Sequence, residues 1–268
     1  MVDSKILCSI EYTGEGFSGF QLQPNRLTIQ GLIENSLQVF FRSKERIPIN
    51  VCSRTDAGVR AKCNLIVFKP KLLDDALELD NMCRSLSFLC KNKVSFLSAT
   101  LVPGDFKFKD SIRGKLYRYY IFRRSTPPTF QKCLVYHYPH HVDEDRLNSE
   151  ANKLCGTHDF RAFRSRYCSS LSTVKTIYLA RFVSAGNLLI FEIAGSGFLH
   201  KMVRMIVGTL IEVSKRNMSI EEILTSNYRL PFVKCLPATG LCLEGIELKD
   251  GTRFGDWDGV PRRDTLIW

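Results

Sequence analysis

Residues 198–214 (FLHKMVRMIVGTLIEVS) are apolar on almost every side at helical spacing. A helix without a polar face has to be enclosed by the rest of the chain, so this segment predicts a buried helix. Arg204 lies in its middle. Leaving a buried guanidinium unpaired costs about 3–5 kcal/mol. Arg204 therefore needs either a carboxylate or a route by which its long side chain reaches solvent.

Length and charge limit the classes of partner. The chain has 268 residues, 44% of them hydrophobic, which suffices for one large domain or two smaller ones. Lys and Arg (38) outnumber Asp and Glu (27), and the resulting net charge of +11 is spread along the chain. This predicts a basic folded surface that meets RNA or DNA, because no basic amphipathic helix suggests a membrane. A basic protein with another partner is the alternative.

Cysteine and histidine patterns favour neither disulfides nor metal. The ten cysteines form no CxxC motif and no Cys/His cluster with zinc spacing, so we expect buried, reduced thiols. His137, His140 and His141 are close together but lack further ligands, which favours a solvated turn. The N-terminus shows no signal peptide, and no apolar run is long enough to span a bilayer. We expect a cytoplasmic protein.

Apolar periodicity predicts an α+β fold in two halves. The pattern stops at Pro103-Gly104-Asp105 and restarts after a basic link. We therefore predict an N-terminal half at 1–105, a C-terminal half at 106–248 and an extension at 249–268. Strands are expected at 5–13, 47–51, 64–69, 94–102, 116–122, 174–183, 187–194 and 240–248, and helices at 28–42, from 74 to about 90, around 147–155, at 198–214 and at 219–227.

A polar stretch at 51–61 interrupts this pattern between two predicted strands. Arg54, Thr55 and Asp56 are followed at once by Ala57-Gly58. Small residues after a carboxylate let a substrate come close, and loops held by strands often carry chemistry. The alternative is an exposed turn with a local contact between Arg54 and Asp56.

Two further segments are open to two interpretations. Residues 14–21 hold three glycines, but no helix follows them directly, which disfavours a dinucleotide-binding loop. The strand 116–122 interleaves tyrosines with Arg118. Such side chains can stack on bases and pair with phosphates, or can simply fill a sheet. We favour RNA contact only at its Lys115/Tyr117 edge.

Six ordered motifs resemble those of TruA-type tRNA pseudouridine synthases, and the resemblance covers about residues 5–248. They are GFQ at 19–21 with TIQG at 28–31, RTDAGV at 54–59, KLYRY at 115–119, GTHDF at 156–160, TVKTI at 173–177 and FLHKMVRMIVG at 198–208. The sequence departs from the family pattern at Phe20, Ser53, Arg60 and the link 106–110, and 249–268 extends past the usual end.

The resemblance implies two similar halves, each a mostly antiparallel mixed sheet with helices on one face, and an active-site cleft between them. It implies isomerisation of uridine to pseudouridine at positions 38–40 of the tRNA anticodon arm, by a homodimer without cofactor or metal. Asp56 would be the catalytic residue and Tyr117 would pack on the target base. Arg204 would pair with the catalytic carboxylate, and Arg54 would help hold the flipped-out nucleotide.

A non-catalytic protein that binds or folds tRNA on the same scaffold is the alternative. Charge and aromatic residues would serve it equally well. It would have no need of the combination of Asp56, Tyr117 and Arg204, so we favour the enzyme.

Overall fold

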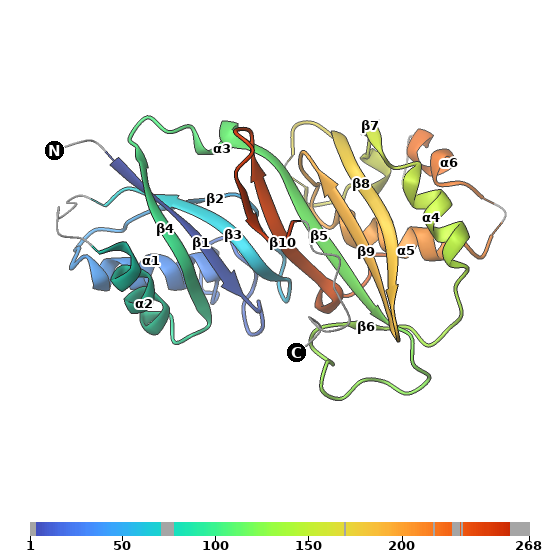
Figure 1. Cartoon of the computed structure of the whole chain (residues 1–268), viewed down its shortest axis with the longest axis horizontal. Helices are drawn as coiled ribbons and strands as arrows, with labels where there is room; N and C mark the ends of the chain where they lie inside the picture. The colour runs from blue at the N-terminus through green and yellow to red at the C-terminus, as the bar shows by residue number, and fades with distance from the viewer. Residues whose placement is uncertain are drawn as a thin grey trace. The chain divides into compact units, whose positions relative to one another are not determined.

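The computed structural model describes residues 4–70, 78–168, 170–216, 218–226, 231 and 233–257, and Figure 1 shows its elements. The chain forms two compact units. Unit 1 runs to Arg113 and resumes over Leu243–Trp257, whereas unit 2 contains Gly114–Cys242. Strand β10 (Leu241–Leu248) therefore begins in unit 2 and ends in unit 1. The halves predicted at 1–105 and 106–248 stay an interpretation of the sequence.

Unit 1 contains a sheet with the strand order β4-β1-β3-β10. β1 pairs antiparallel with both of its neighbours, β2 pairs antiparallel with β3, and β11 pairs antiparallel with β10. Its elements are β1 (Ser4–Tyr12), α1 (Ile29–Phe40), β2 (Ile49–Val51), β3 (Arg60–Phe68), α2 (Leu79–Leu89), β4 (Val94–Pro103), α3 (Phe108–Ser111) and β11 (Arg253–Gly255).

The start of α1 follows from its local sequence. The hydroxyl of Thr28 accepts a hydrogen bond from the Gly31 amide at 3.2 Å, as expected of an N-cap. Ile29, Ile33 and Leu37 recur every fourth residue and are all buried. α1 contacts α2, which in turn packs against β4. One apolar stripe thus ties this helix layer to the sheet.

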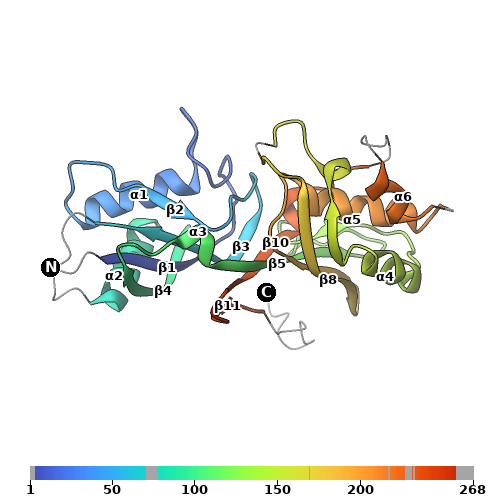
Figure 2. The same ribbon diagram turned by 90° about the horizontal axis from the view of Figure 1, so that it is seen from above.

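Unit 2 contains antiparallel strands in the order β5-β9-β8-β7, with β6 parallel to β5. Its helices α4, α5 and α6 lie side by side (Figures 1 and 2). Strands and helices in both units confirm the predicted α+β class. The elements are β5 (Ile112–Phe122, whose first two residues belong to unit 1), β6 (Tyr136–His137), α4 (Glu144–Asn152), β7 (Gly156–Asp159), η1 (Arg161–Phe163), β8 (Val174–Ala185), β9 (Leu188–Gly195), α5 (Met202–Val213), α6 (Ile220–Thr225) and η2 (Ala238–Gly240).

The basic residue in the middle of β5 belongs to the protein interior. Arg118 is 1% exposed, and its Nε donates to Glu192 Oε1 at 2.7 Å. Arg181 Nε donates to the other oxygen of Glu192 at 2.8 Å. The three residues face one another across β5, β9 and β8. Arg118 therefore pairs with a buried carboxylate and is not presented to RNA.

Several boundaries differ from those predicted, among them the starts of β3 at Arg60 and of β5 at Ile112, each four residues before the predicted start. The segment 156–166, which lies outside the predicted strands and helices, contains β7 and η1. The helix predicted at 198–214 begins only at Met202, because Lys201 has a left-handed φ of 65°. The helix predicted from residue 74 begins at Leu79 in the described part of the chain, and 74–77 lie outside the described residues.

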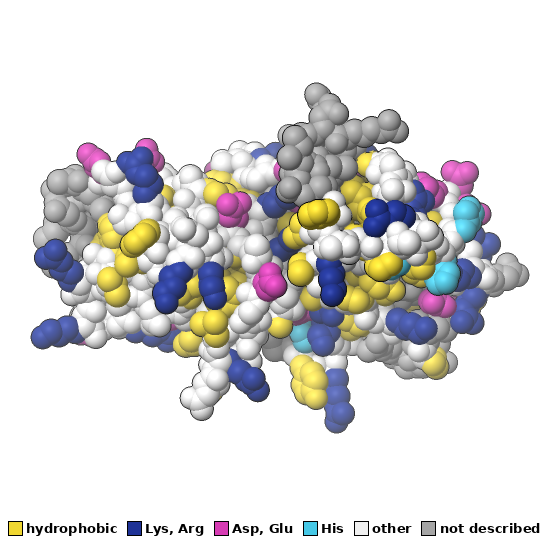
Figure 3. All heavy atoms as spheres, turned by 90° about the horizontal axis from the view of Figure 1, so that it is seen from below, with side chains coloured by type: hydrophobic (Ala, Val, Ile, Leu, Met, Phe, Trp, Pro, Cys, Tyr) yellow, Lys and Arg dark blue, Asp and Glu magenta, His cyan; other side chains and the backbone are white. Residues whose placement is uncertain are grey.

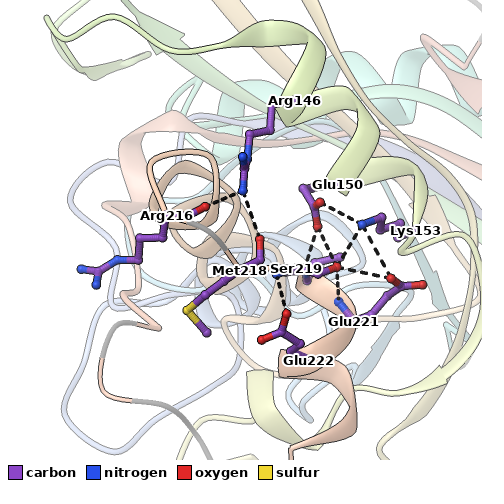
Figure 4. A network of polar contacts seen from close by, with 9 residues as sticks. Arg146, Glu150, Lys153, Arg216, Met218, Ser219, Glu221 and Glu222 are labelled. Carbon is purple, nitrogen blue, oxygen red and sulfur yellow. Dashed lines mark hydrogen bonds and ion pairs between the residues drawn. The ribbon is translucent and has the colours of Figure 1, made fainter.

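A buried carboxylate of α4 holds the start of α6 (Figure 4). Glu150 Oε2 accepts from the Ile220 amide at 2.7 Å, and Glu150 Oε1 accepts from Lys153 Nζ at 2.9 Å. Ser219 and Glu222 form a capping box at the start of α6. Burial acts to raise the pKa of Glu150, but the Ile220 amide and Lys153 outweigh it and lower the pKa below its usual value.

We expect Glu150→Gln to lower the free energy of unfolding by about 1–3 kcal/mol at pH 7, because a charged acceptor becomes a neutral one. A carboxyl whose pKa is lower in the folded state stabilises the fold above its unfolded pKa, and this contribution is lost as the pH falls through the folded pKa. Denaturant titrations at pH 7 and pH 4 should therefore show a smaller difference between variant and wild type at pH 4. Glu222→Gln, an exposed change that keeps an acceptor in the capping box, is the control. Equal denaturation midpoints at pH 7 for wild type, Glu150→Gln and Glu222→Gln would contradict this role for Glu150.

Candidate active-site loop

Residues 52–59 of the polar stretch form the connection between β2 and β3. Arg54 is exposed, Thr55 is 7% exposed and Asp56 is partly buried. The Val59 amide donates to the Asp56 carbonyl at 3.1 Å, closing a turn in which Gly58 has φ of 75°. A side chain would strain that left-handed position, which explains the glycine after Asp56-Ala57. Arg54 is therefore open to solvent, and Asp56 is partly so.

Buried hydrogen bonds anchor this loop to the sheet. Asn64, in β3, is fully buried, and its amide contacts Ser53 on both sides: Oδ1 accepts from the Ser53 amide at 3.2 Å, and Nδ2 donates to the Ser53 carbonyl at 2.8 Å. Asn64 Nδ2 also donates to Tyr12 Oη at 3.0 Å. Tyr12 Oη lies 2.9 Å from Thr55 Oγ1. The anchors are therefore residues 53 and 55, on either side of Arg54.

The glycine-rich segment 14–20 packs against the same loop. The Phe20 amide donates to the Thr55 carbonyl at 3.0 Å. A Cβ on Gly14 would lie 2.3 Å from the Val59 carbonyl oxygen, and a Cβ on Gly19 would lie 3.1 Å from that of Thr55. These glycines permit close approach of two backbone segments, which accounts for them without a bound phosphate.

Tyr117 lies in β5 of unit 2, opposite Ile193 of β9. Its side chain is 6% exposed, and its ring meets that of Phe198 edge-on, with centroids 5.2 Å apart and an interplanar angle of 86°. Edge-to-face packing fixes the orientation of the Tyr117 ring. Only a small part of the ring surface is open to a ligand.

Arg204 lies in the first turn of α5 and is partly buried. Its Nε donates to the Leu236 carbonyl at 2.7 Å, and the Leu236 amide donates to the Arg204 carbonyl at 3.3 Å. Tyr119 Oη donates to the neighbouring Pro237 carbonyl at 2.8 Å. Burial raises the pKa of Tyr119, and the positive charge of Arg204 opposes that rise. Arg204 therefore supports the segment that leads into η2.

The four predicted site residues lie in two different units of the chain. Arg54 and Asp56 share one loop of unit 1, whereas Tyr117 and Arg204 lie on β5 and α5 of unit 2. Sequence reasoning missed Asn64 and the hydroxyl of Tyr12. Tyr12 was only one residue of the strand predicted at 5–13, and Asn64 was only the first residue of the strand predicted at 64–69. A polar residue inside a strand that is otherwise apolar was the available signal.

Basic side chains outnumber acidic ones on the face drawn in Figure 3. Figure 3 shows Lys and Arg scattered over one face with few acidic side chains among them. Among the described residues, no cluster of three or more His, Cys, Asp or Glu side chains could hold a metal ion. Nor does any helix in that part of the chain have the length and hydropathy required to cross a bilayer.

Comparison with known proteins gives consistent relatives. A family model described as tRNA pseudouridine synthase matches residues 151–247. Over 245 residues the chain is 35% identical to tRNA pseudouridine synthase A of Borrelia duttonii, covering 90% of this chain and 98% of the relative. It is 34% identical to proteins of the same name from Bacillus licheniformis and Clostridium acetobutylicum, covering 89% of this chain and 97% of each relative.

Proposed function

We propose a target and a catalytic set for this chain, which belongs to the tRNA pseudouridine synthase A family. As a member it is an isomerase that converts uridine in tRNA to pseudouridine. We propose that its targets are uridines at positions 38–40 of the anticodon arm. We also propose that it acts as a homodimer in the cytoplasm without metal or cofactor. The observation that carries the proposal is similarity over nearly the whole length of relatives that share one name.

Asp56 is the proposed catalytic residue. The reaction breaks the N1–C1′ glycosidic bond, rotates the uracil while it is held, and joins C5 to C1′, with C5 losing its proton and N1 gaining one. One carboxylate can serve it, either by adding covalently or by promoting a glycal intermediate. Support comes from the loop itself, which presents a partly exposed Asp56 from buried anchors at residues 53 and 55. Such rigidity suits a group that has to meet a reacting atom.

Tyr117, Arg54 and Arg204 are the proposed substrate-binding residues. We propose that Tyr117 packs on the target base, using the open part of a ring held by Phe198. Arg54 is exposed beside Asp56 and would hold the flipped-out nucleotide. Arg204 would contribute a planar cation, whose fork suits phosphate or carboxylate. Flipping a uridine costs a few kcal/mol, which basic contacts to the arm can offset.

Mapping of the product tests this proposal. The protein is incubated with unmodified tRNA transcripts that carry uridine at 38, 39 or 40, and pseudouridine is located along each RNA. We expect product at those positions, and none in a matched transcript with cytidine there. Pseudouridine elsewhere would contradict the proposed target. Binding without any product would contradict catalysis and favour a non-catalytic tRNA-binding protein.

A further inference from the structure

The side chain of Asn64 continues the β2–β3 ladder past its last backbone pair. That last bond runs from the Cys52 amide to the Leu65 carbonyl at 2.8 Å. The next residue, Ser53, makes its two backbone hydrogen bonds with the side-chain amide of Asn64, which accepts from the Ser53 N–H and donates to the Ser53 C=O. The backbone of Asn64 is opposite Ile10 of β1. Ser53 is therefore held as if in a strand, while the chain is free to leave the sheet immediately afterwards.

All four hydrogen-bonding positions of the Asn64 amide are used. Oδ1 accepts from the amides of Ser53 and Leu65 (3.0 Å), and Nδ2 donates to the Ser53 carbonyl and to Tyr12 Oη. A primary amide offers two donors and two acceptor sites, so its capacity is filled. A fully satisfied amide at 0% exposure has one favourable orientation.

Tyr12 links the fixed amide of Asn64 to Thr55, the residue before Asp56. A register shift between Ile10 and Tyr12 interrupts the β1–β3 pairing, and such bulges re-aim side chains. The Tyr12 hydroxyl accepts from Asn64, so its own proton is available for Thr55 Oγ1 at 2.9 Å. Tyr12 and Thr55 are 5% and 7% exposed. The bond between them is therefore shielded from competing water.

We propose that Asn64 and Tyr12 are positioning residues that set the orientation of Asp56. The two buried anchors, Ser53 and Thr55, alternate along the loop with the exposed Arg54 and the partly buried Asp56, so fixing the first pair restricts the direction of the second. This inference rests on the proposed catalytic role of Asp56. Loss of one hydroxyl in the network should slow the chemical step and leave tRNA binding almost unchanged, because phosphate contacts carry most of the affinity.

Tyr12→Phe and Thr55→Val are the diagnostic variants, because each removes one hydroxyl at nearly constant volume. We expect the single-turnover rate constant at saturating enzyme to fall about 10- to 100-fold in each, since small misplacements of reacting groups have effects of that size. The Kd for tRNA should change by less than about 2-fold. The double variant should be no slower than the slower single variant, because both remove the same bond.

Ser9→Ala is the matched control. Ser9 is also a buried β1 residue whose hydroxyl bonds another hydroxyl, that of Ser98 at 2.6 Å, but it does not touch the loop. We expect Ser9→Ala to keep the wild-type rate constant. A Tyr12→Phe protein that is folded and as fast as wild type would overturn the proposal. So would equal slowing by Ser9→Ala, which would indicate a general effect on the fold.

Amide hydrogen exchange supplies a readout that does not require catalysis. In Tyr12→Phe, exchange of the amides at residues 53–59 should accelerate about 10-fold or more, with no change in Ser9→Ala. Unchanged exchange in Tyr12→Phe would overturn the positioning role even if wild type is active. A wild-type protein that forms no pseudouridine would contradict the proposed function, and the exchange result would still decide whether Tyr12 fixes the loop.

Discussion

Asp56→Asn should reduce pseudouridine formation on the order of 10³-fold or more, because an amide can neither add to the sugar nor promote cleavage as a carboxylate does. Asparagine has nearly the same shape, and the anchors at Ser53 and Thr55 involve other side chains. We therefore expect the fold to persist and the Kd for tRNA to stay within about 3-fold of wild type. Single-turnover assays and filter binding on the same RNA measure the two quantities.

Asp105→Asn is the control for the loss of one negative charge. Asp105 is exposed in the turn after β4, so its replacement should leave both quantities unchanged. Turnover of Asp56→Asn above a few per cent of wild type would contradict the catalytic assignment. Loss of turnover together with loss of tRNA binding would instead indicate a damaged RNA surface.

Features with local causes were predictable from the sequence. The helices predicted at 28–42 and 219–227 are confirmed, and each begins at a cap, Thr28 or Ser219, that depends on residues within one helical turn. The strands predicted at 174–183 and 187–194 are also confirmed, and they form a hairpin because strand alternation and a turn signal at Ala185-Gly186 lie next to each other in the chain. In each case the partners are close in sequence, so the pattern alone carries the information.

Features with distant causes were not predictable in the same way. β7 is not among the predicted strands, because its short sequence becomes a strand only by pairing with β8, where Gly156 lies opposite Ile177. The Asn64 network joins residues as far apart as 12 and 64. No periodicity within one segment reports such a contact. β11 lies in the predicted extension at 249–268, where it pairs with β10.

The candidate site was predicted in outline, and mostly through the family resemblance. Residue pattern alone indicated a polar loop around Asp56 and a need for partners at Arg204. The structure adds the hydrogen-bond partners of these residues and their neighbours. The buried side-chain amide of Asn64 holds the loop at Ser53, and Arg204 Nε donates to the Leu236 carbonyl. The roles of Asp56, Tyr117, Arg54 and Arg204, and the predicted pairing of Arg204 with Asp56, stay predictions.

Arg204→Lys should lower the single-turnover rate constant about 100-fold while lowering the free energy of unfolding by about 1 kcal/mol. Lysine keeps the positive charge but lacks the planar fork, so it cannot hold the Leu236 carbonyl through Nε and present two further N–H groups at once. The backbone bond from the Leu236 amide to the Arg204 carbonyl does not involve the side chain and should survive.

Arg181→Lys is the matched control, because Arg181 also lies in unit 2 and its Nε also donates to a buried acceptor, Glu192. It should show a comparable or smaller loss of stability with an unchanged rate constant. Arg204→Leu, which also removes the charge, should be at least as slow as Arg204→Lys. If Arg204 served only to hold the Leu236 segment, activity would track stability across all three variants, and a wild-type rate constant in folded Arg204→Lys would exclude a role in substrate binding or catalysis.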